Sequence, residues 1–130
     1  MYTTKLRTNF YDADPAGILF FANIFRLAHS AYEEMIKSWG IGEDVFFSPE
    51  FAMPIVHSEA DYMQSILAHD ELTVNITASQ LKEHSFELSY FFYGDGELKA
   101  KVKTVHVFVE KKSMEKMEIP EPLRVKFGAI

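Results

Sequence analysis

Two acidic residues lie in residues 12–18 (DADPAGI), directly before the longest amphipathic segment of the chain. Asp14 begins a DPAG sequence with Pro15 at the second position and Gly17 at the fourth, as a type I turn prefers. A carboxylate beside a helix N-terminus can serve as general base or nucleophile, because free N–H groups and partial positive charge there stabilise a developing anion. The alternative is that Asp14 only caps the turn. Asp12 is interpreted as a structural acid.

A second group of potential ligands is His57, Glu59 and Asp61, which alternate along one predicted strand and therefore share a face. Such a face can hold a metal ion, but it is more often a solvated or interface surface. The chain has no cysteine, which excludes disulfides, zinc–thiolate sites and a cysteine nucleophile. We therefore predict no metal and no cofactor. His106, in an apolar strand, is predicted to be a packed histidine.

The composition predicts a single domain spanning residues 1–130, with neither membrane nor nucleic-acid partners. Hydrophobic residues make up 48% of the chain and aromatic residues 15%, enough for a core and an apolar pocket. The net charge of −6 argues against the basic face of a nucleic-acid binder. No apolar run has the length of a membrane span, and the N-terminus shows no signal-peptide pattern. We expect a cytoplasmic protein.

The patterning predicts one strand followed by one long helix. Residues 2–10 alternate as a strand does. Residues 22–39 have helical periodicity, and Gly40 follows as a C-terminal cap. The apolar face of this helix is predicted to contain Ile24, Leu27, Ala28, Ala31 and Met35.

Four further strands are expected after the helix, at residues 54–63, 72–80, 85–93 and 98–110. Asp95-Gly96 between the last two suits a type I′ hairpin turn. Residues 41–53 are predicted to be a loop or a short helix, and residues 120–130 a mostly irregular tail. Short connections make the later strands antiparallel, and one helix and one sheet must bury their apolar faces together. The expected fold is α+β: a curved antiparallel sheet around a long central helix, the hotdog architecture.

The segment YDADPAGILFFANIFRLAHSAYEEM, residues 11–35, resembles the opening of a known enzyme family. This family is the hotdog-fold acyl-CoA thioesterases of the 4-hydroxybenzoyl-CoA type, in which an acid, two spacer residues and a glycine lead into the central helix. The resemblance covers nearly the whole chain. It is strongest to the 1,4-dihydroxy-2-naphthoyl-CoA thioesterases of quinone biosynthesis, through FAMPIVHSEADY (51–62) and EHSFELSY (83–90).

The resemblance implies roles for individual residues. Asp14 would be the catalytic carboxylate, either as nucleophile or as general base, while Gly17 and the N–H near Phe21 would orient and polarise the thioester carbonyl. The residues that would contact CoA are Lys82, His84 and Ser85. Water would be the only co-substrate, and the active site would lie at the subunit interface of a homodimer or homotetramer.

Several positions leave a second interpretation open. Glu83 interrupts the basic cluster that the family carries at this point, and His69 precedes Asp70 where relatives often have glycine. His84 can equally be an exposed histidine at a strand end, and Lys82 a solvated side chain. The series Lys99, Lys101 and Lys103 either attracts the phosphates of the nucleotide or keeps an exposed sheet face soluble.

The function expected from these observations is hydrolysis of an aromatic acyl-CoA, with 1,4-dihydroxy-2-naphthoyl-CoA as the foremost substrate. Two alternatives remain. One is a broad or short-chain acyl-CoA or acyl-carrier-protein thioesterase. The other is a non-catalytic hotdog module that binds an acyl group or a partner protein. The absence of a G-x-S-x-G elbow argues against a serine hydrolase.

Overall fold

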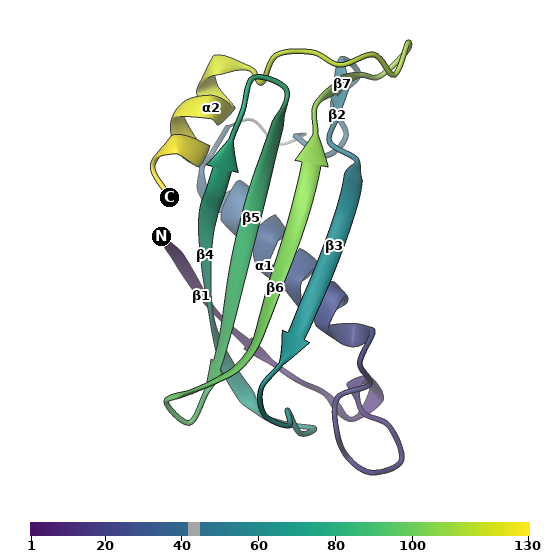
Figure 1. Ribbon diagram of the computed structural model, residues 1–130, viewed down its shortest axis with the longest axis vertical. Helices are drawn as coiled ribbons and strands as arrows, with labels where there is room; N and C mark the ends of the chain where they lie inside the picture. The colour runs from purple at the N-terminus through teal and green to yellow at the C-terminus, as the bar shows by residue number, and fades with distance from the viewer. Residues whose placement is uncertain (42–44) are drawn as a thin grey trace.

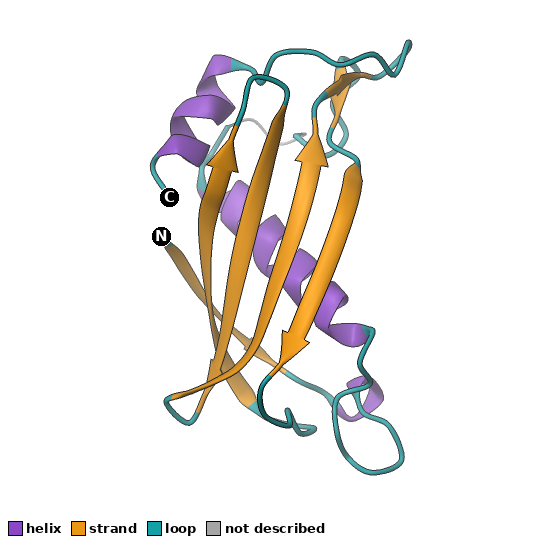
Figure 2. Ribbon diagram, in the orientation of Figure 1, coloured by secondary structure: helices purple, strands orange, loops and turns teal. Residues whose placement is uncertain are grey.

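The computed structural model describes residues 1–41 and 45–130, in which a curved antiparallel sheet wraps around one long helix (Figures 1 and 2). The helix α1 (Asn23–Ser38) crosses the concave face of the sheet diagonally. The sheet has the order β1-β4-β5-β6-β3, and every neighbouring pair is antiparallel. Its strands are β1 (Tyr2–Arg7), β3 (Ile55–Tyr62), β4 (Glu71–Leu81), β5 (Ser85–Gly94) and β6 (Glu97–Val107). This arrangement confirms the predicted α+β architecture.

Short elements flank the main sheet. A 3₁₀ helix η1 (Phe10–Asp12) follows β1, and β2 (Phe51–Ala52) pairs with β7 (Val109–Glu110) in a separate two-stranded sheet. The predicted first strand is thus too long, because the chain turns into η1 after Arg7. The predicted last strand is divided between β6 and β7. The predicted segment 41–53 contains β2, and its residues 42–44 lie outside the described residues.

The core lies between α1 and the concave face of the sheet. The predicted apolar face of α1 is buried, together with Tyr32 and Ile36. Strand β5 alternates as predicted, and its buried residues are Phe86, Leu88, Tyr90 and Phe92. Each side chain of this size contributes about 1.5–3 kcal/mol when fully buried. The β5–β6 turn has positive φ at both Asp95 (51°) and Gly96 (75°), as a type I′ turn requires.

The predicted irregular tail is wrong, because residues Glu121–Gly128 form a second helix, α2. Pro120 precedes this helix and Pro122 lies in its first turn, where a missing N–H costs nothing. Leu123 and Phe127 are buried, and the ring of Phe127 stacks on Phe86 with centroids 4.0 Å apart. Two prolines and a short apolar pattern concealed the helix in the sequence. Its stability depends on this packing.

His106 lies in the core, as predicted, at one end of a buried polar chain. Its ring stacks on Phe86 with centroids 4.5 Å apart, and Tyr32 of α1 covers it at 4.9 Å. Its Nε2 lies 2.9 Å from the Thr104 hydroxyl, which lies 3.1 Å from that of Tyr90. Burial lowers the pKa of His106 to about 4, against 6.5 for the free side chain.

The free energy of unfolding should therefore fall as the pH is lowered from about 6.5 to about 4. In this window the unfolded chain binds a proton at residue 106 and the folded chain does not, so acid favours unfolding. The shift corresponds to about 3 kcal/mol at its full extent. The measurement is urea unfolding between pH 7 and pH 4.5 for the wild type and His106→Gln. The exposed His57→Gln is the control. Parallel pH curves for the wild type and His106→Gln would contradict this account.

Candidate active site

Asp14 lies at the tip of a short hairpin that leads directly into α1. The N–H of Phe20 donates to the carbonyl of Asp12 (2.9 Å), and the N–H of Asp14 donates to the carbonyl of Ile18 (2.8 Å). An isolated bridge between Ala13 and Leu19 lies between these two bonds. Gly17 closes the tip with a φ of 79°, a conformation that residues with a side chain rarely adopt. The local sequence thus fixes the position of Asp14 relative to the helix.

The carboxylate of Asp14 is shared between the turn and the surface. Its Oδ1 accepts the N–H of Ala16 at 2.8 Å and that of Ile18 at 3.4 Å. Its Oδ2 has no hydrogen-bond partner in the part of the chain that the structure describes, and the side chain is half-buried. The turn-cap interpretation and the catalytic interpretation of Asp14 are therefore compatible with each other. One oxygen caps the turn, and the other is available for chemistry.

Asp12 has a structural role, as predicted. It is only 1% exposed, and it forms an ion pair with Arg26 of α1. Its Oδ2 accepts the N–H of Asn9 at 2.8 Å, and its backbone carbonyl accepts the side-chain amide of Asn23 at 2.9 Å. These contacts tie the hairpin to η1 on one side and to α1 on the other.

The start of α1 offers two backbone donors. The N–H groups of Asn23 and Ile24 bond to the carbonyls of Phe20 and Phe21, at 2.9 and 3.4 Å. The N–H groups of Phe21 and Ala22 have no acceptor among residues 1–41 and 45–130. Unpaired N–H groups at a helix start attract negative charge. The N–H of Gly17 is not such a donor, because it bonds to the Asp14 carbonyl at 2.9 Å. Gly17 therefore shapes the turn.

An exposed apolar surface surrounds this end of α1. A cavity of about 360 Å³ lies between the hairpin and the end of β3, and its lining includes Leu19, Phe21 and Tyr62. The side chain of Phe21 is 65% exposed. The hydroxyl of Tyr62 donates a hydrogen bond to the carbonyl of Phe21. Tyr62 was not predicted as a site residue, because nothing in the sequence pattern of β3 indicates that its last side chain reaches the helix.

The predicted CoA-contacting residues lie at the other end of the sheet. Ser85 pairs with Val107, whereas Tyr62, beside the hairpin, pairs with Ala100. From Val107 to Ala100 along β6 is roughly 23 Å at about 3.3 Å per residue. In Figure 1 the β4–β5 turn and the loop that leads into α1 lie at opposite ends of the molecule. A single chain therefore does not bring Asp14 and Ser85 together.

The β4–β5 turn that carries these residues is held by α2. The guanidinium of Arg124 donates to the carbonyls of Lys82 and Glu83, at 2.8 and 3.0 Å. The side chain of Lys82 is exposed. Nε2 of His84 lies 3.8 Å from the Glu83 carboxylate, while its Nδ1 is buried without a hydrogen-bond partner in the described part of the chain. Arg124 was not identified from the sequence, since its segment was predicted to be irregular.

The charged residues of β3 face away from α1. Glu59 pairs in register with Lys103, and Asp61 with Lys101. Lys103 also lies 3.6 Å from the Glu87 carboxylate. Over the described ranges 1–41 and 45–130, no cluster of three or more His, Asp or Glu side chains could hold a metal ion. Acidic neighbours therefore offset the charge of Lys101 and Lys103, which favours the interpretation of this strand face as a solvated surface.

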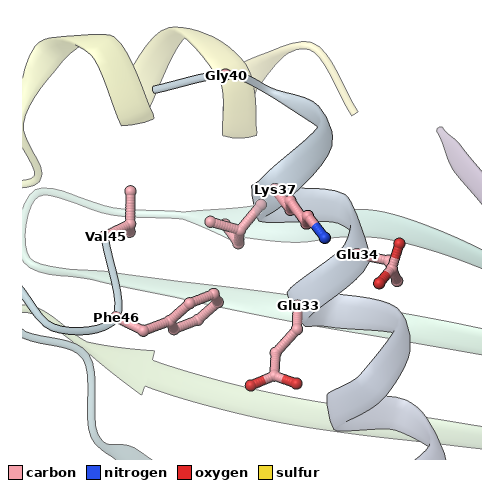
Figure 3. A pocket seen from close by; sticks show the side chains of 7 residues that line it. Glu33, Glu34, Lys37, Gly40, Val45 and Phe46 are labelled. Carbon is pink, nitrogen blue, oxygen red and sulfur yellow. The ribbon is translucent and has the colours of Figure 1, made fainter. Parts of the chain in front are cut away.

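A second, larger cavity of about 610 Å³ lies near the C-terminal end of α1 (Figure 3). The charged side chains of Glu33, Glu34 and Lys37 line its helix side, and Val45 and Phe46 line the facing segment. Most of the length of α1 separates this cavity from the hairpin. It is therefore not part of the site around Asp14. No helix in the described part of the chain is long and apolar enough to cross a membrane.

Comparison with known proteins places these features in a family. A family model described as the thioesterase-like superfamily matches residues 8–127. The chain belongs to this superfamily. The match includes the hairpin, the central helix and all strands of the main sheet except β1. The predicted thioesterase family is therefore confirmed.

Individual relatives point to one branch of this family. The chain is 31% identical over 123 residues to a 1,4-dihydroxy-2-naphthoyl-CoA hydrolase of Nostoc punctiforme, covering 94% of this chain and 83% of the relative. It is 36% identical over 108 residues to an enzyme of the same name from Crocosphaera subtropica, covering 80% and 79%.

A solved structure shows the same fold. The crystal structure of a 1,4-dihydroxy-2-naphthoyl-CoA thioesterase from Synechocystis superposes with a TM-score of 0.91 and 26% identity, covering 99% of this chain and 96% of the other. The predicted hotdog fold and the predicted similarity to this branch are confirmed.

Proposed function

We propose that the protein hydrolyses an aromatic acyl-CoA to the free acid and CoA, with Asp14 as the catalytic carboxylate. The observation that carries this proposal is the position of Asp14. One of its oxygens is fixed by the turn at 2.8 Å from the Ala16 N–H, and the other is unpaired among the described residues. The hairpin that holds it joins the helix end where the N–H groups of Phe21 and Ala22 lack acceptors.

The proposed reaction needs no group beyond these residues and water. With Asp14 as general base, water attacks the thioester carbon and passes a proton to Asp14. The C–S bond then breaks, and the proton moves to the leaving thiolate of CoA. With Asp14 as nucleophile, the carboxylate attacks the thioester carbon and the C–S bond breaks to release the CoA thiolate. Water then hydrolyses the resulting mixed anhydride to the free acid and the Asp14 carboxylate, and the proton that water gives up goes to the thiolate. In both routes the oxyanion lies at the start of α1, where the Phe21 N–H stabilises it.

The proposed substrate is 1,4-dihydroxy-2-naphthoyl-CoA, used in quinone biosynthesis. The names of the relatives support this substrate, since several at 31–36% identity are 1,4-dihydroxy-2-naphthoyl-CoA hydrolases. The apolar surface around Phe20, Phe21 and Tyr62 also suits a flat aromatic group.

The proposed active unit is a homodimer, alone or within a homotetramer, with the active site at the subunit interface. Strand β3 is an edge of the sheet with exposed apolar residues, Ile55 and Val56. Antiparallel pairing of β3 with its copy reverses the direction of the second sheet. The sheet end at Tyr62 in one subunit then lies beside the sheet end at Ser85 in the other subunit. Lys82, His84 and Ser85 are proposed to contact CoA bound at the partner's Asp14.

Asp14→Asn should keep the fold and lose most of the activity. The Asn side-chain oxygen can still accept the Ala16 N–H, but a neutral amide is neither a useful base nor an anionic nucleophile. We expect kcat to fall by a factor on the order of 10²–10⁴, with a much smaller change in KM. Steady-state kinetics and circular dichroism measure both effects.

The control for this variant is Asp12→Asn, two residues away. Asp12 pairs with Arg26 in a buried position, so this change should mainly lower thermal stability and affect kcat of the folded protein less. A folded Asp14→Asn enzyme that keeps half of its activity would exclude the catalytic role of Asp14.

Aromatic acyl-CoAs should be better substrates than long straight-chain ones. The exposed rings near the start of α1 can stack on a flat acyl group, whereas a long chain gains little from them. The measurement is kcat/KM for naphthoyl-CoA, benzoyl-CoA and palmitoyl-CoA. An equal or higher value for palmitoyl-CoA would overturn the proposed substrate class.

The protein should sediment as a dimer or tetramer of the 15.0 kDa chain at micromolar concentration. Val56→Lys should raise the dissociation constant by about tenfold or more, because it buries an unpaired charge in the β3 interface. Val125→Lys on α2 is a matched control, since Val56 and Val125 are 61% and 59% exposed in the single chain. Sedimentation velocity over a dilution series gives both constants. A wild-type monomer at micromolar concentration would contradict the proposal.

A further inference from the structure

The hydrogen bond between Tyr62 and Phe21 joins the edge strand of the sheet to the start of the central helix. Tyr62 is the last residue of β3, and its hydroxyl donates to the carbonyl oxygen of Phe21. A phenol has a pKa of about 10 and keeps its proton at neutral pH, and burial raises the pKa of Tyr62 further. The only other donor to this carbonyl within the described residues is the N–H of Ile24, at a long 3.4 Å. Tyr62 is therefore the principal constraint on the Phe21 carbonyl.

This carbonyl belongs to the same peptide group as the N–H of Ala22. A trans peptide is planar, so its C=O and N–H point in opposite directions. Holding the carbonyl therefore also fixes the direction of the N–H. A hydrogen bond to the oxygen further polarises the peptide group and makes its N–H a stronger donor. Neither this N–H nor the preceding one at Phe21 has an acceptor in residues 1–41 and 45–130.

We propose that Tyr62 is a positioning residue of the thioesterase site, which fixes and polarises the Phe21–Ala22 peptide so that the Ala22 N–H acts as a second oxyanion donor beside Phe21. This inference rests on the proposed function. Tyr62 touches the peptide and not the reacting atoms. Its effect should therefore be seen in the transition state, where negative charge develops on the thioester oxygen, more than in substrate binding.

The test is Tyr62→Phe, which removes one hydroxyl and keeps the ring. Because Tyr62 is 47% exposed and the ring is kept, the variant should fold, with a thermal midpoint only slightly lowered by the loss of one hydrogen bond. On naphthoyl-CoA we expect kcat to fall about five- to tenfold, the worth of one neutral hydrogen bond, with KM unchanged within about twofold. The control is Tyr93→Phe on β5, which should leave both constants as in the wild type.

A spectroscopic measurement separates positioning from a general structural effect. In the slow Asp14→Asn background, bound naphthoyl-CoA should absorb at longer wavelength than free naphthoyl-CoA, because donors to the thioester oxygen polarise the conjugated carbonyl. Adding Tyr62→Phe should reduce this red shift, and adding Tyr93→Phe should not.

Three results would overturn the inference while leaving the proposed function intact: kcat of Tyr62→Phe within twofold of the wild type, a rise in KM at constant kcat, or an unchanged red shift. If the wild type does not hydrolyse any aromatic acyl-CoA, the proposed function fails, and the inference fails with it.

Discussion

The site depends on one buried carboxylate, that of Asp12. A buried charge is stable only when it is paired and hydrogen-bonded, and the Asp12 carboxylate has two such partners. These are the guanidinium of Arg26 on α1 and the N–H of Asn9 before η1. The backbone carbonyl of Asp12 is held separately, by the side-chain amide of Asn23 at the helix start. Satisfying this carboxylate therefore fixes the hairpin against the helix. Without these interactions of Asp12, the position of Asp14, two residues further along the chain, would not be fixed relative to the helix.

The two acids of the hairpin differ in how completely their carboxylates are used by the surrounding structure. Asp12 is almost fully enclosed, and its interactions hold the local backbone. Asp14 lies two residues further along the hairpin, beyond the bridge between Ala13 and Leu19. One of its carboxylate oxygens bonds to the turn, which orients the other oxygen without enclosing it. A carboxylate that is held but not fully satisfied combines a fixed geometry with a free lone pair. The choice between turn cap and catalytic residue is therefore not exclusive here.

The sequence predicted the parts of the fold that arise from hydrophobic periodicity and from turn-forming residues. The helix, the alternation of β5 and the Asp95-Gly96 turn all follow local rules, and the structure has them within a residue or two. The helix α2 was missed because its stability comes from Phe127 packing on Phe86, a contact between segments that lie far apart in sequence. Local patterns carry no information about such a contact.

The same limit applies to the site. The DPAG pattern located Asp14, because turn preferences are local. The link from Tyr62 to Phe21 could not be read from the sequence, since it depends on how far β3 extends beside the helix start. The distance between Asp14 and Ser85 could not be predicted from the sequence either, because it follows from the strand register across β5, β6 and β3. Family resemblance supplied the roles of these residues, and only the three-dimensional arrangement shows which of them one chain can bring together.

The two edges of the sheet differ in a way that decides which one suits pairing. β1, at one edge, carries Lys5 and Arg7, and charged residues of this kind discourage strand addition (Figure 1). At the other edge, the acids of β3 are already matched in register by Lys101 and Lys103 within the chain. That edge therefore presents little unbalanced charge, and its first two residues are exposed and apolar. The strand that is free to pair is also the strand that ends at Tyr62. The proposed association of two chains through β3 would thus involve the same strand that holds the Phe21–Ala22 peptide, so that assembly and the geometry of the proposed oxyanion donors would be coupled through Tyr62.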